Sequence, residues 1–202
     1  MTIQPGTFRD AADFDLSKED FEIGKCHDER ANWHLTAEPD YFKGLINQYE
    51  FFRKNIFNPK RVFYPSSSVD ASPVKGFPDS EVVLMDRDEQ VSYVMKKYNI
   101  KEFIQGDVLA YTPEKPFDLV IMLNPCLKSS DLTRHLVLGG YAMANNWNNN
   151  ASQLLKNKDF EGVGTILRDK KGPFLAKKDF SRLEPHQFAT LFYVFKKLQE
   201  TK

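Results

Sequence analysis

Short apolar segments that alternate with amphipathic ones are the feature that most constrains the fold of this chain. The strongest apolar run is FDLVIML at residues 117–123, and EVVLMD at 81–86 is a second. Between them, DEQVSYVMKKY at 88–98 places Val91 and Val94 on one face of a helix. Runs that are apolar throughout are typical of strands buried on both faces of a parallel sheet.

The order of these segments predicts an α/β fold: a doubly wound, mostly parallel, seven-stranded sheet with helices on both faces. The expected strands are residues 62–64, 81–86, 102–109, 117–123, 141–145, 160–167 and 190–196. The last two are expected to be antiparallel and to lie at a sheet edge. A helix is expected at 129–138, with a serine cap and with Gly139 and Gly140 as its stop.

An N-terminal arm and helical extension is expected at 1–58, before a Rossmann-like domain at 59–202. Within the extension, the apolar residues of 38–55 follow a helical period. The tripeptide EPD at 38–40 supplies the acid and proline that a helix N-terminus prefers. We expect the aromatic residues of this helix to bury it against the sheet rather than to line a pocket.

Composition argues against several classes of protein. The formal net charge of the 202 residues is zero, so no overall field attracts nucleic acid or an anionic membrane. Two cysteines, far apart, favour neither a disulfide framework nor a cysteine zinc site, and no metal is expected. The first residues lack the pattern of a signal peptide, and no apolar run approaches the ~20 residues that cross a bilayer. We therefore expect a soluble, cytoplasmic protein.

Polar residues gather just after the predicted strands. In an open parallel sheet, ligands bind beyond the carboxyl ends of the strands, where the strand order reverses. The candidate cofactor-binding residues are Pro65, Ser66, Ser67, Ser68, Asp70, Asp86, Arg87, Asp107, Val108 and Asn124. Taken singly, Asp86 is explained as well by capping the next helix, and Asp107 by a turn.

Together, these elements resemble the class I S-adenosylmethionine-dependent methyltransferases over about residues 60–198. In that family the loop after the first strand holds the methionine part of the cofactor, a place that residues 65–70 take here. An acid ending the second strand holds the ribose, a position that Asp86 takes in VVLMDRDE, and a GD pair lies beside the adenine, as in QGDVL with Asp107 and Val108. The resemblance implies S-adenosylmethionine as cofactor, S-adenosylhomocysteine as product, and Asn124 in FDLVIMLNP as the catalytic candidate.

The first loop departs from the family pattern. It reads FYPSSSVDASP, where the family has an acid followed by glycines, and a serine side chain makes positive φ costly. Asp70 is the candidate replacement for the missing acid. LNPCL is similar to the Asn-Pro-Pro-aromatic motif of amino-group methyltransferases, without the second proline and the aromatic residue.

Two functions therefore stay open. The first is a methyltransferase that acts on a small molecule or a macromolecule. The second is a catalytically inactive methyltransferase-like protein with a binding or structural role. A nicotinamide-dependent dehydrogenase would need a G-x-G-x-x-G fingerprint after the first strand, and the sequence has none there.

Overall fold

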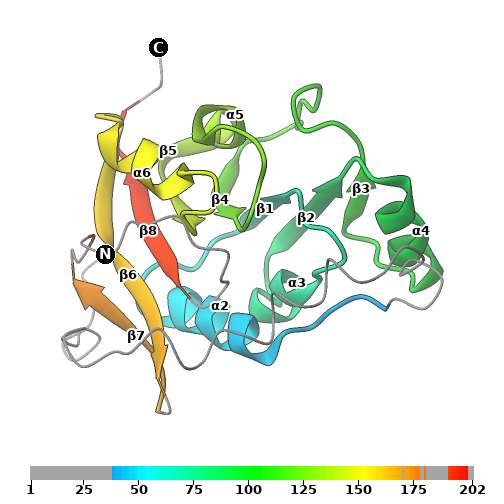
Figure 1. Cartoon of the computed structure of the whole chain (residues 1–202), viewed down its shortest axis with the longest axis horizontal. Helices are drawn as coiled ribbons and strands as arrows, with labels where there is room; N and C mark the ends of the chain where they lie inside the picture. The colour runs from blue at the N-terminus through cyan, green and yellow to red at the C-terminus, as the bar shows by residue number, and fades with distance from the viewer. Residues whose placement is uncertain (1–37, 170, 178–179, 181–190, 200–202) are drawn as a thin grey trace.

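An eight-stranded sheet with the order β3-β2-β1-β4-β5-β8-β6-β7 forms the centre of the computed structural model (Figure 1). The structure describes residues 38–169, 171–177, 180 and 191–199. The strands are β1 (Arg61–Pro65), β2 (Glu81–Asp86), β3 (Phe103–Gln105), β4 (Phe117–Met122), β5 (Leu136–Ala144), β6 (Phe160–Asp169), β7 (Gly172–Lys177) and β8 (Phe192–Lys197). The helices are α2 (Lys43–Asn55), α3 (Ser72–Gly76), α4 (Glu89–Lys97), α5 (Ser129–Thr133) and α6 (Asn150–Lys156).

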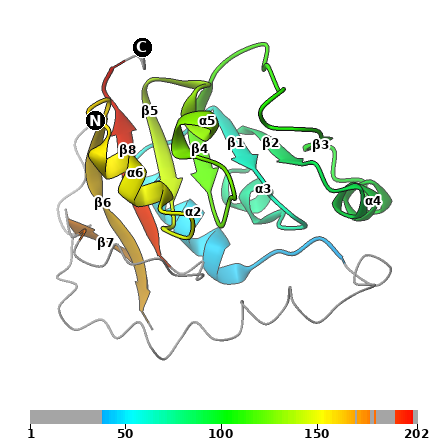
Figure 2. The ribbon, with the colours of Figure 1, turned by 45° about the horizontal axis from the view of Figure 1, so that its top comes forward.

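The direction of the strands confirms the expected fold class. Strands β1 to β5 pair in parallel, whereas β8 is antiparallel to both β5 and β6. The central strands β1, β2 and β4 are buried along almost their whole length, which explains their continuous apolar sequence. Figure 2 shows β3 and α4 at one end of the sheet and β7 at the other.

The sheet has one strand more than expected. Strand β7, in a segment where no strand was expected, pairs antiparallel with β6 and takes the sheet edge that was expected for the strands at 160–167 and 190–196. Its sequence, GPFLAK, begins with glycine and proline, which usually indicate a turn. Pro173 is tolerated because an edge strand leaves one row of backbone donors unpaired.

Helices cover both faces of the sheet (Figure 1). Apolar residues of α2 and α4 share one buried cluster with alternate residues of β1, such as Val62 and Tyr64. Residues of α5 and α6 share a second cluster with Phe63, which points to the opposite face. The central strands β1, β2 and β4 are therefore buried on both sides, as the predicted layer arrangement requires, whereas the edge strand β3 is largely exposed.

Helix α2 confirms the helical period seen at 38–55, and it is shorter than expected. Its residues Leu45, Tyr49 and Phe52 are at most 2% exposed. The Tyr49 ring lies 5.5 Å from that of Phe77 and 5.6 Å from that of Phe192, measured between centroids. These aromatic side chains bury the helix against the sheet, as expected.

The EPD tripeptide does not begin the helix. Asp40 forms a parallel bridge with Asp70: its N–H donates to the Val69 carbonyl at 2.8 Å, and its carbonyl accepts from Ala71 N at 2.9 Å. Phe42 N also donates to Ser72 Oγ at 2.9 Å. Residues 38–42 therefore pair with the loop after β1 instead of starting the helix. This pairing holds them against the candidate cofactor loop. The rest of the expected arm, residues 1–37, lies outside the described residues, so the proposed domain boundary stays a prediction.

The glycine pair at 139–140 corrects another expectation. The helix expected at 129–138 ends at Thr133, and β5 already begins at Leu136. The pairing of β4 with β5 shifts register between Phe117 and Leu119, so both glycines lie in a bulge inside the strand. A Cβ on Gly140 would lie 3.0 Å from the Asp118 carbonyl oxygen, so the bulge needs a residue without a side chain.

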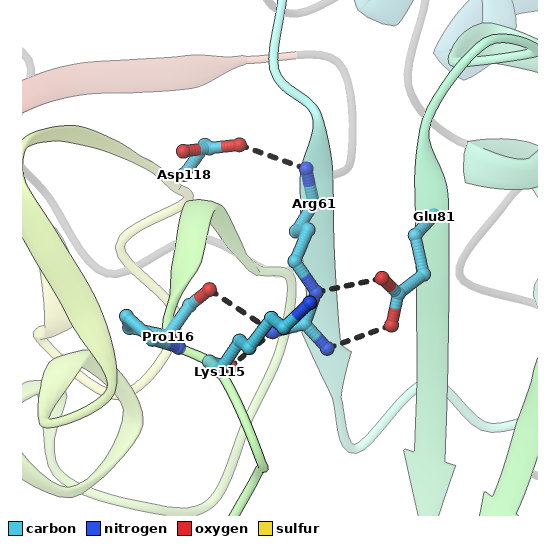
Figure 3. A network of polar contacts seen from close by, with 5 residues as sticks. All are labelled: Arg61, Glu81, Lys115, Pro116 and Asp118. Atoms are coloured by element: carbon cyan, nitrogen blue, oxygen red, sulfur yellow. Dashed lines mark hydrogen bonds and ion pairs between the residues drawn. The ribbon is translucent and has the colours of Figure 1, made fainter.

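Arg61 joins three segments at the amino ends of the strands (Figure 3). Its Nε and Nη2 each donate to a carboxylate oxygen of Glu81 at 2.7 Å. Its Nη1 donates to the carbonyls of Lys115 and Pro116, and its guanidinium lies 4.7 Å from the Phe117 ring centroid. The hydrogen bonds from Arg61 lower the pKa of the Glu81 carboxyl.

Asp118 completes this amino edge. Its Oδ2 accepts from the backbone N–H of Arg61 at 2.9 Å (Figure 3). The same oxygen accepts from the backbone N–H of Lys60 at 2.8 Å. An aspartate on β4 thus holds the start of β1, which fixes the alignment of the two central strands.

Candidate functional site

The carboxyl ends of β1 to β5 meet at one edge of the sheet because these strands are parallel. The strand order reverses between β1 and β4, which makes this the switch point at which ligands bind in open α/β sheets. The predicted candidate residues lie at this edge: Pro65 and Asp86 end β1 and β2, and the others lie in the loops that follow β1, β2, β3 and β4.

The serine loop after β1 holds two residues in the left-handed region. Ser66 has φ 54° and Ser68 has φ 50°, conformations that favour glycine. Ser67, between them, is 1% exposed, and its N–H donates to the Met85 carbonyl at 3.0 Å. The loop therefore adopts positive φ at two serines rather than avoiding it, and each small side chain is only half-buried at the surface.

Asp86 joins the serine loop to β2. Its Oδ2 accepts from Ser68 N at 2.9 Å, and its Oδ1 accepts from Asp88 N at 3.0 Å. The cap of α4 is Asp88, whose side chain accepts from Gln90 N at 2.7 Å. The capping explanation for Asp86 is therefore wrong, because the neighbouring aspartate fills that place. Each Asp86 oxygen keeps further acceptor capacity, and the side chain is half-buried at the sheet edge.

Asp70 lies beneath the serine loop and is 6% exposed. Its Oδ1 accepts from Ser72 N at 2.8 Å, and its Oδ2 accepts from the Tyr64 hydroxyl at 3.2 Å. Burial raises the pKa of this carboxyl to about 6, against the opposing effect of its hydrogen bonds with Ser72 and Tyr64. Burial also raises the pKa of the Tyr49 and Tyr64 hydroxyls well above their ordinary value.

The turn after β3 is tied to Asp86 through the backbone. Gly106 N donates to the Asp86 carbonyl at 3.0 Å. Asp107 is exposed, and its Oδ1 accepts from Leu109 N at 2.9 Å, whereas Val108 is 6% exposed. The structure thus connects the serine loop, Asp86 and the GD turn by direct hydrogen bonds. Of the remaining candidates, Pro65 is buried at the end of β1 and Arg87 is exposed after β2.

Two asparagines lie at the carboxyl ends of β4 and β5. Asn124 is exposed, with φ 52°, and its N–H donates to Asn145 Oδ1 at 3.1 Å. Asn145 Nδ2 donates to Asn124 Oδ1, and Asn145 itself is fully buried. Asn124 was predicted from the sequence without this partner. An asparagine at the ends of two adjacent parallel strands is the signal that would have paired them.

A pocket lies away from this edge. An open pocket of about 360 Å³ borders the amino end of β5, with Pro113, Pro116 and residues 134–138 as its walls. Burial lowers the pKa of His135 in this wall. The pocket contains none of the candidate residues, so it is separate from the switch point.

Further geometry bears on metals and membranes. Among the described residues, no group of three His, Cys, Asp or Glu side chains is arranged to hold a metal ion. Within the same part of the chain, no helix is long and apolar enough to cross a membrane.

Similar solved structures are methyltransferases. A putative caffeoyl-CoA O-methyltransferase from Staphylococcus aureus matches with TM-score 0.55 and 11% identity, over 82% of this chain and 88% of that one. A putative O-methyltransferase from Klebsiella pneumoniae has TM-score 0.52 and 9% identity, over 79% and 82%. The N-methyltransferase NodS from Bradyrhizobium japonicum WM9, in complex with S-adenosyl-L-homocysteine, has TM-score 0.51 and 10% identity, over 77% and 84%.

Sequence comparison adds no relative. No family model matches the chain, and no curated protein matches it significantly. The likeness therefore lies in the backbone, where five parallel strands end at a switch point and an antiparallel strand inserts beside β5. The chain has the fold of the class I S-adenosylmethionine-dependent methyltransferases.

Proposed function

We propose that this protein is an S-adenosylmethionine-dependent methyltransferase whose cofactor lies across the serine loop, Asp86 and the GD turn. The proposal rests mainly on the position and contacts of Asp86. This residue ends β2 at the switch point, it is not needed as a helix cap, and its lone pairs suit the two hydroxyls of a ribose. When bound, the cofactor would supply a methyl group already activated on sulfonium.

The serine loop fits the same ligand. Positive φ at Ser66 and Ser68 turns the chain sharply beside Asp86, and the N–H groups of Ser67 and Ser68 are bonded to the Met85 carbonyl and to Asp86 Oδ2, so the loop is held in one shape before a ligand binds. The cofactor's methionine part would lie against this loop, with Ser66 and Ser68 small enough to allow close approach. Asp107 and Val108 would lie beside the adenine, and Asp70 supports the loop from below.

Left-handed backbone at the serine loop favours a ligand site at this edge. Among the described residues, positive φ outside glycine occurs at Ser66, Ser68, Asn99, Asn124 and Asn149. Asparagine adopts this region routinely, so the two serines are the unusual members, and both lie in the loop that follows β1. Strained residues persist where the structure around them fixes a functional arrangement.

Calorimetric titration with S-adenosylmethionine and S-adenosylhomocysteine tests the proposal. Asp86→Ala is expected to weaken binding by about 100-fold, because hydrogen bonds to a charged group contribute ~1.5–3 kcal/mol each. Asp88→Ala is the matched control: it removes the α4 cap, costs about 1 kcal/mol of folding free energy, and leaves the ribose contact intact.

The titration has two outcomes that count against the proposal. If neither cofactor form binds the wild-type chain at millimolar concentration, the methyltransferase function is wrong. If Asp88→Ala weakens binding as much as Asp86→Ala, the assignment of the ribose site to Asp86 is wrong. Binding without methyl transfer to any acceptor would favour the inactive methyltransferase-like alternative.

A further inference from the structure

The amide of Asn145 has only one orientation consistent with its neighbours. Its Oδ1 faces the backbone N–H of Asn124 at 3.1 Å and that of Trp147 at 3.5 Å. A backbone N–H can only donate, so the atom that faces them must be the oxygen. The other atom of the amide, Nδ2, is therefore the donor that faces the Asn124 side chain.

This orientation fixes the Asn124 amide in turn. Because Asn145 Nδ2 donates, the Asn124 atom that meets it must be the carbonyl oxygen Oδ1. The Asn124 Nδ2 then points away from Asn145. It belongs to an exposed side chain and has no hydrogen-bond partner among the described residues. The carboxyl end of β4 thus presents an N–H donor at the switch-point edge, rather than an acceptor.

On this geometry, and resting on the methyltransferase function proposed above, we propose that the methyl acceptor is an oxygen anion, a phenolate or a carboxylate, held by Asn124 Nδ2. Asn124 contacts the acceptor, and Asn145 is the positioning residue that determines which end of the Asn124 amide faces it. An N–H donor attracts an anionic oxygen through a charge-assisted hydrogen bond.

The chemistry of the acceptor atom separates oxygen from nitrogen. A phenolate or carboxylate oxygen can accept the Asn124 N–H with one lone pair and attack the methyl carbon with another. The new oxygen–carbon bond forms as the carbon–sulfur bond breaks, its electron pair stays on sulfur, and no proton has to leave. A neutral amine has one lone pair, which a hydrogen bond from Asn124 would occupy. The donor therefore assists an oxygen nucleophile and opposes an amine.

Side-chain amide NMR of the full chain, saturated with S-adenosylhomocysteine, tests this inference without turnover. The probes are two matched pairs: para-nitrophenolate with para-nitroaniline, and benzoate with benzylamine. The Asn124 Nδ2 resonance is expected to shift with the oxygen member of at least one pair and not with its nitrogen partner.

Three substitutions sharpen the test. Asn124→Asp keeps the acceptor that Asn145 needs but presents a carboxylate, so oxygen probes are expected to bind about tenfold more weakly. Asn149→Asp is the matched control, with the same charge change at another exposed left-handed asparagine near this edge, and leaves their binding unchanged. Asn145→Asp removes the donor that holds Asn124 Oδ1, so the Asn124 amide turns, presents Oδ1, and favours the nitrogen probes.

The outcomes separate the two proposals. If S-adenosylhomocysteine does not bind, the saturation step that precedes the probes shows it, and the proposed function is overturned. If it binds, an Asn124 shift with a nitrogen probe equal to or larger than that with its oxygen partner overturns the oxygen acceptor. If neither oxygen probe shifts the Asn124 resonance, the oxygen acceptor is overturned as well. The same holds if Asn124→Asp and Asn149→Asp weaken the binding of the oxygen probes equally.

Discussion

The two edges of the sheet use the same kind of contact in different surroundings. At the amino edge, Asp118 accepts from two backbone N–H groups and Arg61 uses its guanidinium on protein acceptors. At the carboxyl edge, Asp86 also accepts from two backbone N–H groups. The loop that it holds has strained backbone and small side chains. Residue type alone therefore does not distinguish the structural carboxylate of Asp118 from that of Asp86, which we propose to bind a ligand. The strained backbone next to Asp86 and its position at the switch point are the features that differ.

The largest expected effect breaks the amino edge. Arg61→Ala is expected to lower the free energy of unfolding by about 3 kcal/mol, because it removes hydrogen bonds to two carbonyls and a carboxylate as well as packing on Phe117. Urea unfolding measures the change. Arg61→Lys keeps the charge but loses the two-pronged contact with Glu81, so it is expected to recover only part of the loss.

Ligand binding by the Arg61→Ala variant tests whether the two edges are independent. Under conditions where Arg61→Ala is folded, it is expected to bind S-adenosylhomocysteine as the wild type does, since Arg61 lies at the opposite ends of the strands from Asp86. A loss of binding as large as that of Asp86→Ala would contradict the separation of stability from ligand binding between the two edges.

The next effect concerns the buried carboxyl beneath the serine loop. The pKa of Asp70 is raised to about 6, above its unfolded value, so the folded state binds a proton more tightly than the unfolded chain. Its contribution to stability is therefore fully present below about pH 4 and is lost as pH rises through about 6, a change of roughly 2 to 3 kcal/mol. Asp70→Asn keeps the shape and an acceptor for Ser72 N, and is expected to remove this dependence.

Urea unfolding of the wild type and the Asp70→Asn variant over this pH range measures the effect. The difference between them is the quantity of interest, because other carboxyl groups titrate equally in both. The variant is expected to gain stability relative to the wild type as the pH approaches neutrality. A difference that stays constant with pH would show that Asp70 has the same pKa in the folded and unfolded states, and that burial does not raise it.

Much of the fold was predictable because its signals are local. Strands β2 and β4 are buried on both faces, so each is a continuous apolar run that reveals itself in the sequence. The amino-terminal part of β5 was not, because residues 129–138 look helical and the bulge at Gly140 depends on contact with Asp118. The pairing of Asp40 with Asp70 likewise depends on backbone groups far apart in the chain, which no local pattern records.

The candidate site divides in the same way. Its residues were named from their positions after strands, but their orientation was not. That Asp88 caps α4, which leaves Asp86 to hold the serine loop, follows from geometry at a strand end. That Asn124 presents its nitrogen follows from an N–H on its own backbone that meets Asn145. The serine loop is the exception. Stereochemistry alone predicted that positive φ would be costly for its serines, and Ser66 and Ser68 do have positive φ.

The smallest expected effect measures that strain. Ser66→Gly or Ser68→Gly is expected to raise the free energy of unfolding by up to about 1 kcal/mol, since glycine avoids the left-handed penalty at a small cost in chain entropy. Ser67→Gly is the matched control: its φ is not positive, so glycine brings the entropic cost, removes the buried hydroxyl that donates to the Ser68 carbonyl, and lowers stability by about 1–2 kcal/mol.

Opposite signs within one short loop make this prediction sensitive to the cause. A loss of stability at all three serines would mean that their side chains hold the loop and that positive φ costs little there. A gain at 66 and 68 together with weaker S-adenosylhomocysteine binding has a further meaning: the serine side chains would then stiffen the loop in its binding conformation, at the expense of stability. The strained carboxyl edge would differ from the amino edge because it holds a ligand, since the same strain would serve no purpose in a loop that only connects two strands.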